Sequence, residues 1–241
     1  MDKPTIRKYG PRGILMEWEP SISPEVNDQV IRTAQLIKQK YDQIILEVVP
    51  SYHSLLVFLK KEVDHQSYIA ISTYIDIEIY RNSKSEEKPT WHVPTCYDPS
   101  FGYDLASISE TSQLPIASII RLHSEVKYRI YGMGFLPGFL YLGGLDKRLH
   151  LPRKSQIKQF VPKGSVAIGG QQTGIYPQTS PGGWNVIGKT PIELFNPQLD
   201  NPTPFSIGDS IQFVPVDLDA FNDIQARVKE GNYQLKSVFD D

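Results

Sequence analysis

The side chains most suited to chemistry in this 241-residue sequence are concentrated between positions 133 and 188. Two stretches there, GGQQTGIYP (169–177) and TSPGGW (179–184), alternate neutral hydrogen-bonding side chains with glycines, which let backbone N–H groups face a ligand. The hydrogen-bonding side chains are Gln171, Gln172, Thr173, Tyr176 and Ser180. Such a surface suits a small polar ligand with an amide or a carboxylate, or the oxyanion formed from one. The alternative, which the residues leave open, is a pair of turns whose side chains satisfy buried backbone groups.

Two charged or titratable side chains extend this candidate site. Arg153 follows a proline in LPRKS (151–155), which suits a guanidinium that binds a carboxylate or phosphate, although a solvated surface charge is the simpler interpretation. His123 ends a predicted helix, where a cation at the negative helix end is a simpler interpretation than proton transfer. We predict Arg153, Gln172, Tyr176 and His123 as catalytic residues. The predicted substrate-binding residues are Thr173, Gly174, Ser180, Gly182, Gly183 and Trp184.

Other kinds of catalytic site are not expected in this chain. The five histidines are not spaced for metal binding, so we expect no metal. The single cysteine, Cys96, allows no intrachain disulfide, and we expect it to be a half-buried strand residue rather than a nucleophile. The segment GWNVIGKT (183–190) matches the letters of a phosphate loop, but its bulky interior and the following Pro191 favour a strand between two turns.

Composition and charge narrow the class of protein. Hydrophobic residues make up 40% of the chain and charged residues 22%, which is typical of a globular protein with a sizeable core. The net charge of −2 gives no general attraction to nucleic acid or to an anionic membrane. No apolar run approaches the roughly 20 residues of a membrane helix, and residues 1–10 lack the apolar core of a signal peptide. We therefore expect a cytoplasmic protein that binds neither nucleic acid nor membrane.

The glycines divide the chain into two parts. None lies between Gly13 and Gly102, so ordinary strands and helices are expected there. The predicted strands are 6–9, 14–18, 44–49 and 55–59, and the predicted helices are one that starts at Ser23 and one at 67–80. The polar stretch 81–90 is the predicted linker, and we expect a small α+β domain at residues 1–85.

The second part is expected to form a domain at residues 90–241. After its first helices, its pattern changes to short strands between turns. The predicted helices are 104–109, 116–123 and 218–229, and the predicted strands are 91–97, 128–133, 166–168, 184–187, 192–195 and 211–216. Many short strands joined by glycine and proline turns favour a closed or nearly closed β-barrel. We expect the run from Met133 to Trp184 to line a single hollow on the wall of that barrel.

Several long motifs resemble a known family in their order and spacing. They are GFLPGFLYLGGLDKRLHLPRKS (134–155), VPKGSVAIGGQQTGIYP (161–177) and SPGGWNVIGKTPIELFNP (180–197), together with RGILMEW, VVPSYHSLLV, HVPTCYD and FGYDL. The family is that of the allophanate hydrolase subunit 1-like proteins, and the resemblance covers nearly the whole chain. It implies an α+β protein in which a small α+β N-terminal domain precedes a cyclophilin-like β-barrel domain.

The resemblance also implies a function. Family members include the B subunit of bacterial 5-oxoprolinase, which acts with the A and C subunits to open 5-oxo-L-proline to L-glutamate with ATP hydrolysis. We therefore expect one component of a heteromeric enzyme, inactive alone, with ATP bound elsewhere in the complex. The alternative is a relative that binds and inhibits a sporulation histidine kinase. A stand-alone hydrolase is a weaker option, because the sequence shows no recognisable nucleophile, metal set or nucleotide loop.

The chain departs from the family pattern beside the expected pocket. Leu136 and Leu140 replace residues that are commonly threonine and proline. The stretch that contains Lys154, Ile157, Lys158 and Phe160 replaces one richer in arginine and proline, and Ala167 and Gln171 replace glycines. These changes leave open which member of the family the chain is.

Overall fold

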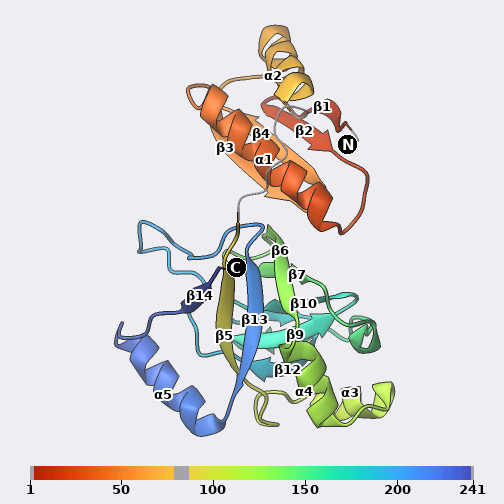
Figure 1. Ribbon diagram of the computed structural model, residues 1–241, viewed down its shortest axis with the longest axis vertical. Helices are drawn as coiled ribbons and strands as arrows, with labels where there is room; N and C mark the ends of the chain where they lie inside the picture. Colours follow the sequence, from red (N-terminus) through yellow and green to blue (C-terminus); the bar gives the residue numbers. More distant parts are fainter. Residues whose placement is uncertain (1–2, 79–86, 240–241) are drawn as a thin grey trace. The chain divides into compact units, whose positions relative to one another are not determined.

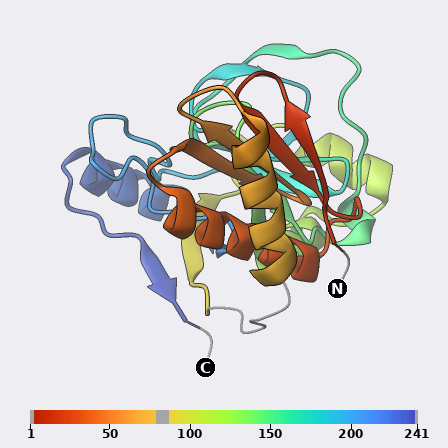
Figure 2. The same ribbon diagram turned by 90° about the horizontal axis from the view of Figure 1, so that it is seen from above.

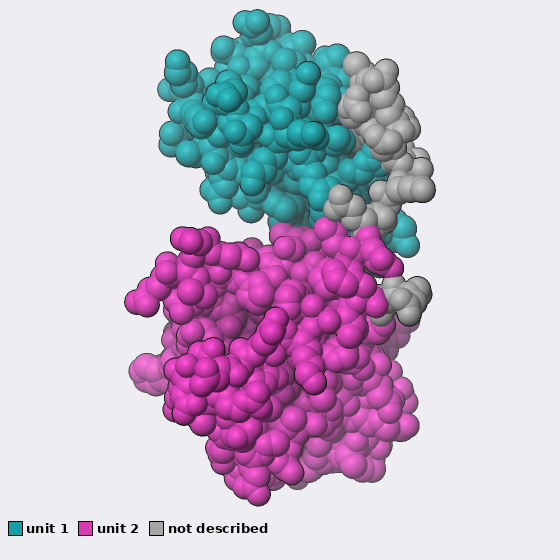
Figure 3. Space-filling model, turned by 60° about the vertical axis from the view of Figure 1, so that its left-hand side comes forward, with its two compact units in different colours: residues 1–86 teal, residues 87–241 magenta. Residues whose placement is uncertain are grey.

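The structure, a computed structural model, describes residues 3–78 and 87–239 and divides into two compact units. Unit 1 spans Met1–Glu86 and unit 2 spans Glu87–Asp241 (Figure 3). Most of the predicted linker at 81–90 lies outside the described residues, and Thr90 already belongs to a strand of unit 2. No helix in the described ranges is long and apolar enough to cross a membrane.

Within residues 3–78, unit 1 forms an antiparallel four-stranded sheet in the order β1-β2-β4-β3, and two helices pack on one of its faces (Figure 1). The strands are β1 (Thr5–Tyr9), β2 (Gly13–Glu17), β3 (Ile45–Ser51) and β4 (Ser54–Leu59), and the helices are α1 (Pro24–Tyr41) and α2 (His65–Glu78). The helices cross in Figure 2. The rings of Tyr41 and Tyr74, one from each helix, meet edge to face with centroids 5.6 Å apart.

The local sequence explains these elements. The Ser23 hydroxyl caps α1 by accepting the backbone N–H of Val26 at 3.3 Å, and Pro24 takes the first helical position. Alternate residues of β2 and β4, such as Ile14 and Leu55, are fully buried against the helices. The predictions of strands at the start of the chain and of a helix that starts at Ser23 are confirmed. The helix predicted at 67–80 is also present as α2, although residues 79 and 80 lie outside the described residues.

Within residues 87–239, seven strands of unit 2 close into a barrel in the order β12-β9-β10-β7-β6-β13-β5. Lys189 of β12 pairs with Cys96 of β5 and closes the ring. The barrel strands are β5 (Thr90–Cys96), β6 (Lys127–Met133), β7 (Leu140–Gly143), β9 (Ser165–Gly169), β10 (Gln172–Ile175), β12 (Asn185–Lys189) and β13 (Ser210–Val216). The α+β class with a C-terminal barrel is therefore confirmed.

The remaining elements lie around this barrel. The helices are α3 (Leu105–Ser112), α4 (Ile116–Ser124) and α5 (Leu218–Lys229), with a 3-10 turn at Lys147–Leu149. Strand β14 (Lys236–Val238) pairs with β5, and β8 (Lys158–Val161) pairs with β11 (Ser180–Gly182) in a separate two-stranded sheet. The barrel wall has apolar clusters on both faces. The cluster outside the wall consists of Phe139, Val161, Ala167, Tyr176, Trp184 and Val186.

Three predictions for unit 2 are corrected. The segment 192–195 is not a strand, because Pro191 and Pro197 flank it, although Ile192 and Leu194 are still buried in the barrel core. The short strands β7, β8, β10, β11 and β14 were not predicted. Cys96 is buried rather than half-buried, with 1% of its surface exposed, and burial raises the pKa of its thiol, as expected for a structural cysteine.

Candidate functional site

The indole of Trp184 forms the floor of the candidate site on the outer face of the barrel wall. A Cβ added to Gly169 would lie 2.7 Å from this ring, and one added to Gly174 would lie 3.0 Å from it. The ring therefore rests directly on the backbone of β9 and β10, which only glycine permits. Phe139 meets Trp184 edge to face at 5.7 Å and Tyr176 at 5.6 Å, so the floor is a packed aromatic layer.

Arg153 lies above this floor because its own segment is tied down at several points. The N–H of Gly170 donates to Leu151 O at 2.7 Å, the Asn185 side chain donates to Pro152 O at 3.2 Å, and Lys154 N–H donates to Gly183 O at 2.7 Å. The exposed guanidinium of Arg153 lies 5.8 Å from the Trp184 ring centroid. Segments far apart in the sequence thus present one exposed cation over one aromatic ring.

A part-buried ion pair anchors the same segment. The Lys154 ammonium lies 2.6 Å from Asp104 Oδ1, while Asp104 Oδ2 accepts the backbone N–H of Val186 at 2.7 Å. Asp104 therefore joins the start of α3 to β12 and to the segment that carries Arg153. Beside it, Lys158 Nζ lies 3.6 Å from the centroid of Tyr103, and burial, followed by the charge of Asp104, raises the pKa of Tyr103 to about 12.

Gln172 and Tyr176 share the outer face with Trp184. Thr173 points into the barrel, so strand alternation directs Gln172 and Gly174 outward, and Gln172 pairs across the strands with Gly169, beneath the indole. Tyr176 is buried and its hydroxyl abuts Gly182, where a Cβ would collide with it. Burial raises the pKa of this hydroxyl, while a hydrogen bond to the Trp184 backbone and the charge of Arg153 oppose the rise.

His123 and Thr173 lie inside the barrel, away from this surface. His123 is fully buried, its Nδ1 lies 2.7 Å from the Tyr97 hydroxyl and its Nε2 lies 2.8 Å from Thr173 Oγ1. Burial lowers the pKa of His123 to about 3, so the ring is neutral at physiological pH. The interpretation of His123 as a cation at the helix end is therefore wrong, because the last turn of α4 faces the barrel core.

The structure thus brings part of the predicted site together. Arg153 lies over the Trp184 ring and Gly174 lies beneath it. Tyr176 is linked to the ring through Phe139, and Gln172 pairs with Gly169, on which the ring rests. Gly183 accepts a hydrogen bond from the backbone of Lys154. Ser180 is buried and its hydroxyl donates to Pro181 O at 3.3 Å, a local bond that uses up its donor. Sequence reasoning missed the contribution of Asp104 and of Phe139. No sequence signal links Asp104 to Lys154, whereas Phe139 was visible within the GFLPGFLYLGG motif.

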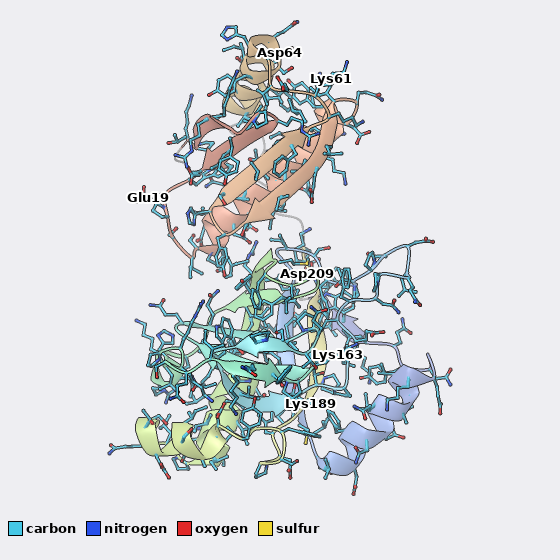
Figure 4. All side chains as sticks on the ribbon, turned by 180° about the vertical axis from the view of Figure 1, so that it is seen from behind. Glu19, Lys61, Asp64, Lys163, Lys189 and Asp209 are labelled. Atoms are coloured by element: carbon cyan, nitrogen blue, oxygen red, sulfur yellow. The ribbon has the colours of Figure 1, made fainter. Side chains whose placement is uncertain are left out.

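The phosphate-loop letters at 183–190 form a barrel strand, β12, as predicted. Lys189, labelled in Figure 4, belongs to this strand. It pairs with Cys96 in the barrel wall, and its ammonium lies 5.2 Å from the Phe101 ring. Such a strand cannot wrap a phosphate. Among the described residues, no group of three or more histidine, cysteine, aspartate or glutamate side chains could hold a metal ion.

Large exposed hydrophobic side chains border the site. Phe135 is 64% exposed, Ile157 68% and Phe160 75%. The Phe135 ring lies 5.5 Å from Phe139, and a Cβ on Gly183 would lie 3.9 Å from Ile157. Phe160 belongs to β8, whose partner strand β11 contains Ser180 and Gly182. Phe135 also has a φ of 61°, a left-handed conformation that a bulky residue rarely adopts. We call Phe135, Ile157 and Phe160 the apolar rim.

Fold and site together define a class: α+β proteins in which a small helix-covered sheet precedes a closed seven-stranded barrel with a polar and aromatic outer face. The family described as "Carboxyltransferase domain, subdomain C and D" matches residues 4–205. The B subunit of 5-oxoprolinase from Bacillus subtilis is 35% identical over 88% of this chain and 92% of its own length. That of Haemophilus influenzae is 39% identical over 83% and 92%. The chain belongs to this family of carboxyltransferase-type barrel proteins, which includes the 5-oxoprolinase B subunits.

Solved structures extend the comparison to longer chains. The protein TTHA0988 is 29% identical with a TM-score of 0.74 and matches 86% of this chain. The Kluyveromyces lactis urea amidolyase matches 98% at a TM-score of 0.79 but only 18% identity, which shows the fold alone. This chain spans 40% of the first and 16% of the second. In both proteins the same fold is therefore one part of a larger polypeptide.

Proposed function

We propose that this chain is the B subunit of an ATP-dependent 5-oxoprolinase, a complex that opens 5-oxo-L-proline to L-glutamate with ATP hydrolysis. The 5-oxoprolinase B subunits of three bacteria are 33% to 39% identical to it over most of the chain. The observation that carries the proposal is the exposed Arg153 above Trp184, beside the outward-facing Gln172. We also propose a cytoplasmic location, where ATP is available.

The chemistry of this surface fits the substrate. 5-Oxo-L-proline carries one carboxylate and one cyclic amide on a small, largely apolar ring. In our proposal Arg153 binds the carboxylate, the Gln172 side chain pairs with the lactam amide, and Trp184 supports the ring. Tyr176 lies beneath the floor with its hydroxyl against Gly182, so it holds the glycine-rich backbone in place rather than moving a proton.

Ring opening needs activation because an amide is a stable bond. One route transfers the terminal phosphoryl group of ATP to the lactam oxygen. Water then adds to the activated carbon, the carbon–nitrogen bond breaks, the nitrogen leaves as the amine, and a second water releases phosphate. Negative charge grows on oxygen during these steps, and Arg153 can stabilise it. ATP binds elsewhere in the complex in this proposal, because the phosphate-loop letters of this chain form β12.

The apolar rim supports an assembly with a second type of chain. A left-handed Phe135 costs about 1–3 kcal/mol of backbone strain, and the rim exposes three large hydrophobic side chains beside a charged site. We propose that the A or C component of the enzyme covers this rim and completes the pocket, so that the chain is inactive alone. The longer chain of TTHA0988, in which this fold is one part, agrees with such an assembly.

The test is reconstitution with candidate A and C subunits and measurement of 5-oxoproline-dependent ATP hydrolysis. We expect activity only when all three components are present. Activity that persisted without this chain would reject the proposal. A chain that gave no activity in any combination, yet bound a sporulation histidine kinase and blocked its autophosphorylation, would favour the inhibitor alternative.

The rim is tested in the same assembly with Phe135→Ala and Phe160→Ala. Each variant should weaken co-purification with the partner chain, because each removes an exposed aromatic anchor. Phe239→Ala is the matched control, since Phe239 is 62% exposed and does not belong to the rim. Equal co-purification of all three variants would remove the rim from the proposed interface.

A further inference from the structure

A buried chain of hydrogen bonds crosses the barrel interior behind the candidate site. It runs from the Tyr97 hydroxyl to His123 Nδ1 (2.7 Å), from His123 Nε2 to Thr173 Oγ1 (2.8 Å), and from Thr173 Oγ1 to Ala167 O (3.1 Å). Tyr97 directly follows β5, and the other members come from α4, from β10 and from β9. His123, Thr173 and Ala167 have no exposed surface, so water does not compete for these bonds.

In this chain of hydrogen bonds, the donors and acceptors can be assigned in one consistent direction. Ala167 O can only accept, so the Thr173 hydroxyl donates to it, and Thr173 Oγ1 in turn accepts from His123 Nε2–H. A neutral imidazole then has a bare Nδ1, which accepts the Tyr97 O–H. Each side-chain donor in this chain of hydrogen bonds makes one hydrogen bond. A second proton on His123 would turn Nδ1 into a donor and leave the Tyr97 proton without its acceptor.

The surroundings of His123 keep it in this state. Phe213 of β13 and Tyr128 of β6 pack against the imidazole at 4.4 Å and 5.3 Å between ring centroids. The titratable side chains that contact it are Tyr97, through its hydroxyl, and Tyr128, through its ring. The burial that lowers its pKa to about 3 agrees with a permanently neutral ring.

The position of Thr173 gives this chain of bonds an effect on the outer face. Thr173 lies between Gln172 and Gly174 in a strand of four residues, and Trp184 rests on Gly174. A displacement of Thr173 therefore moves the backbone on which Gln172 and Trp184 depend. We propose that His123 is a positioning residue, which holds Thr173 from inside the barrel and so fixes the strand that presents Gln172 to the substrate. The link to substrate rests on the proposed function, whereas the link to β10 does not.

The variants separate positioning from proton transfer. Thr173→Val keeps the volume and removes both the bond to His123 and the bond to Ala167 O, and Thr173→Ser restores the hydroxyl. His123→Phe removes both bonds of the ring. Tyr128→Phe is the matched control, because within the described residues the buried Tyr128 hydroxyl has no hydrogen-bond partner although its ring packs on His123.

The first measurement is hydrogen–deuterium exchange on the full chain without substrate or partner. Amides of residues 172–175 should exchange about tenfold faster in Thr173→Val and His123→Phe, with wild-type rates in Thr173→Ser and Tyr128→Phe. Unit 1 amides should be unchanged. Equal exchange of β10 in Thr173→Val and in the wild type would overturn the proposal, even if His123→Phe failed to fold.

The second measurement is the activity of the reconstituted complex across pH. Thr173→Val should lower kcat/KM by about tenfold or more, with recovery in Thr173→Ser and an unchanged pH profile. A His123→Phe variant with a normal β10 but without the basic or acidic limb of the profile would instead identify His123 as a proton carrier and contradict positioning. Faster β10 exchange in chains that show no 5-oxoprolinase activity even as wild type would reject the proposed function and leave the positioning role intact.

Discussion

On the inner face of β10, Thr173 is buried and hydrogen-bonded to a neutral histidine, whereas on the outer face of the same strand Gln172 faces outward beside an aromatic floor and an exposed arginine. The inner face is buried, and the hydroxyl of Thr173 there is hydrogen-bonded. The outer face has glycines where side chains would be expected, and its charge is open to solvent. The comparison shows that two adjacent residues of one strand lie in opposite environments, because the strand alternates its side chains. In the proposed function, Thr173 serves stability and Gln172 serves binding.

The acid sensitivity of the inner face gives the largest expected effect. His123 has a pKa of 6.5 in an unfolded chain and about 3 in the fold, so the unfolded chain binds more protons between these values. The fold, in which His123 stays neutral, should therefore have its full stability above pH 6.5. Below this pH the free energy of unfolding should fall as the pH decreases toward 3, by up to about 1.4 kcal/mol per pH unit.

The measurement is urea denaturation of the wild type and His123→Gln over this pH range. The other carboxylates titrate in both proteins, so the difference between the two slopes isolates His123. His123→Gln should have the shallower slope. Parallel slopes would show that His123 is not held neutral, and the contrast between the two faces would lose its main support.

A methyl group at Gly169 tests the outer face. Gly169→Ala should destabilise the chain by about 1–3 kcal/mol and displace Trp184, because the new Cβ would lie 2.7 Å from the indole. Trp184 fluorescence and thermal denaturation measure both effects. Gly134→Ala is the control, since no atom lies within 4 Å of its added Cβ. Equal stability of the two variants would mean that the indole does not rest on β9.

A smaller effect is expected from the ion pair that anchors Arg153. Asp104→Asn should cost about 1–2 kcal/mol, less than for a fully buried pair because Lys154 is partly exposed. The control is Glu193→Gln, which removes an equally short but exposed bond of 2.7 Å to Lys163 and should cost less than about 0.5 kcal/mol. If chemical denaturation gave the same loss for both variants, Asp104 would not be the anchor of the segment.

The sequence could predict the elements that have local signals, but not the strand whose glycine is explained by a distant residue. Helix α5 occupies the predicted residues 218–229, since its apolar stripe and capping residues are local signals. Strand β10 was not predicted, because Gly174 suggests a turn when the chain is considered locally. The glycine is needed for the tryptophan that covers it, and Trp184 lies ten residues further on. Likewise, Ile192 and Leu194 fill the core at strand spacing without any strand pairing.

The sequence predicted which residues could make up the candidate site, but not on which face of the barrel wall each side chain lies. The motifs that contain Arg153, Gln172, Tyr176 and Trp184 were identified from residue types alone, and the structure places them on the same outer face of the barrel wall. His123 and Thr173 have equally suitable chemistry but lie inside the barrel. Only the closure of the barrel decides between these faces, and closure depends on pairs such as Lys189 with Cys96 that are distant in the sequence.

The most direct test of the central claim, that substrate binds on the outer face around Trp184, is the kcat/KM of the reconstituted complex for 5-oxoproline with Arg153→Ala. Arg148→Ala is the matched control, because Arg148 is also exposed and pairs only locally with Asp146. We predict a loss of about tenfold or more for Arg153→Ala, as expected for a lost charge-assisted contact, and wild-type activity for Arg148→Ala. Wild-type kcat/KM in the Arg153→Ala complex would contradict the claim.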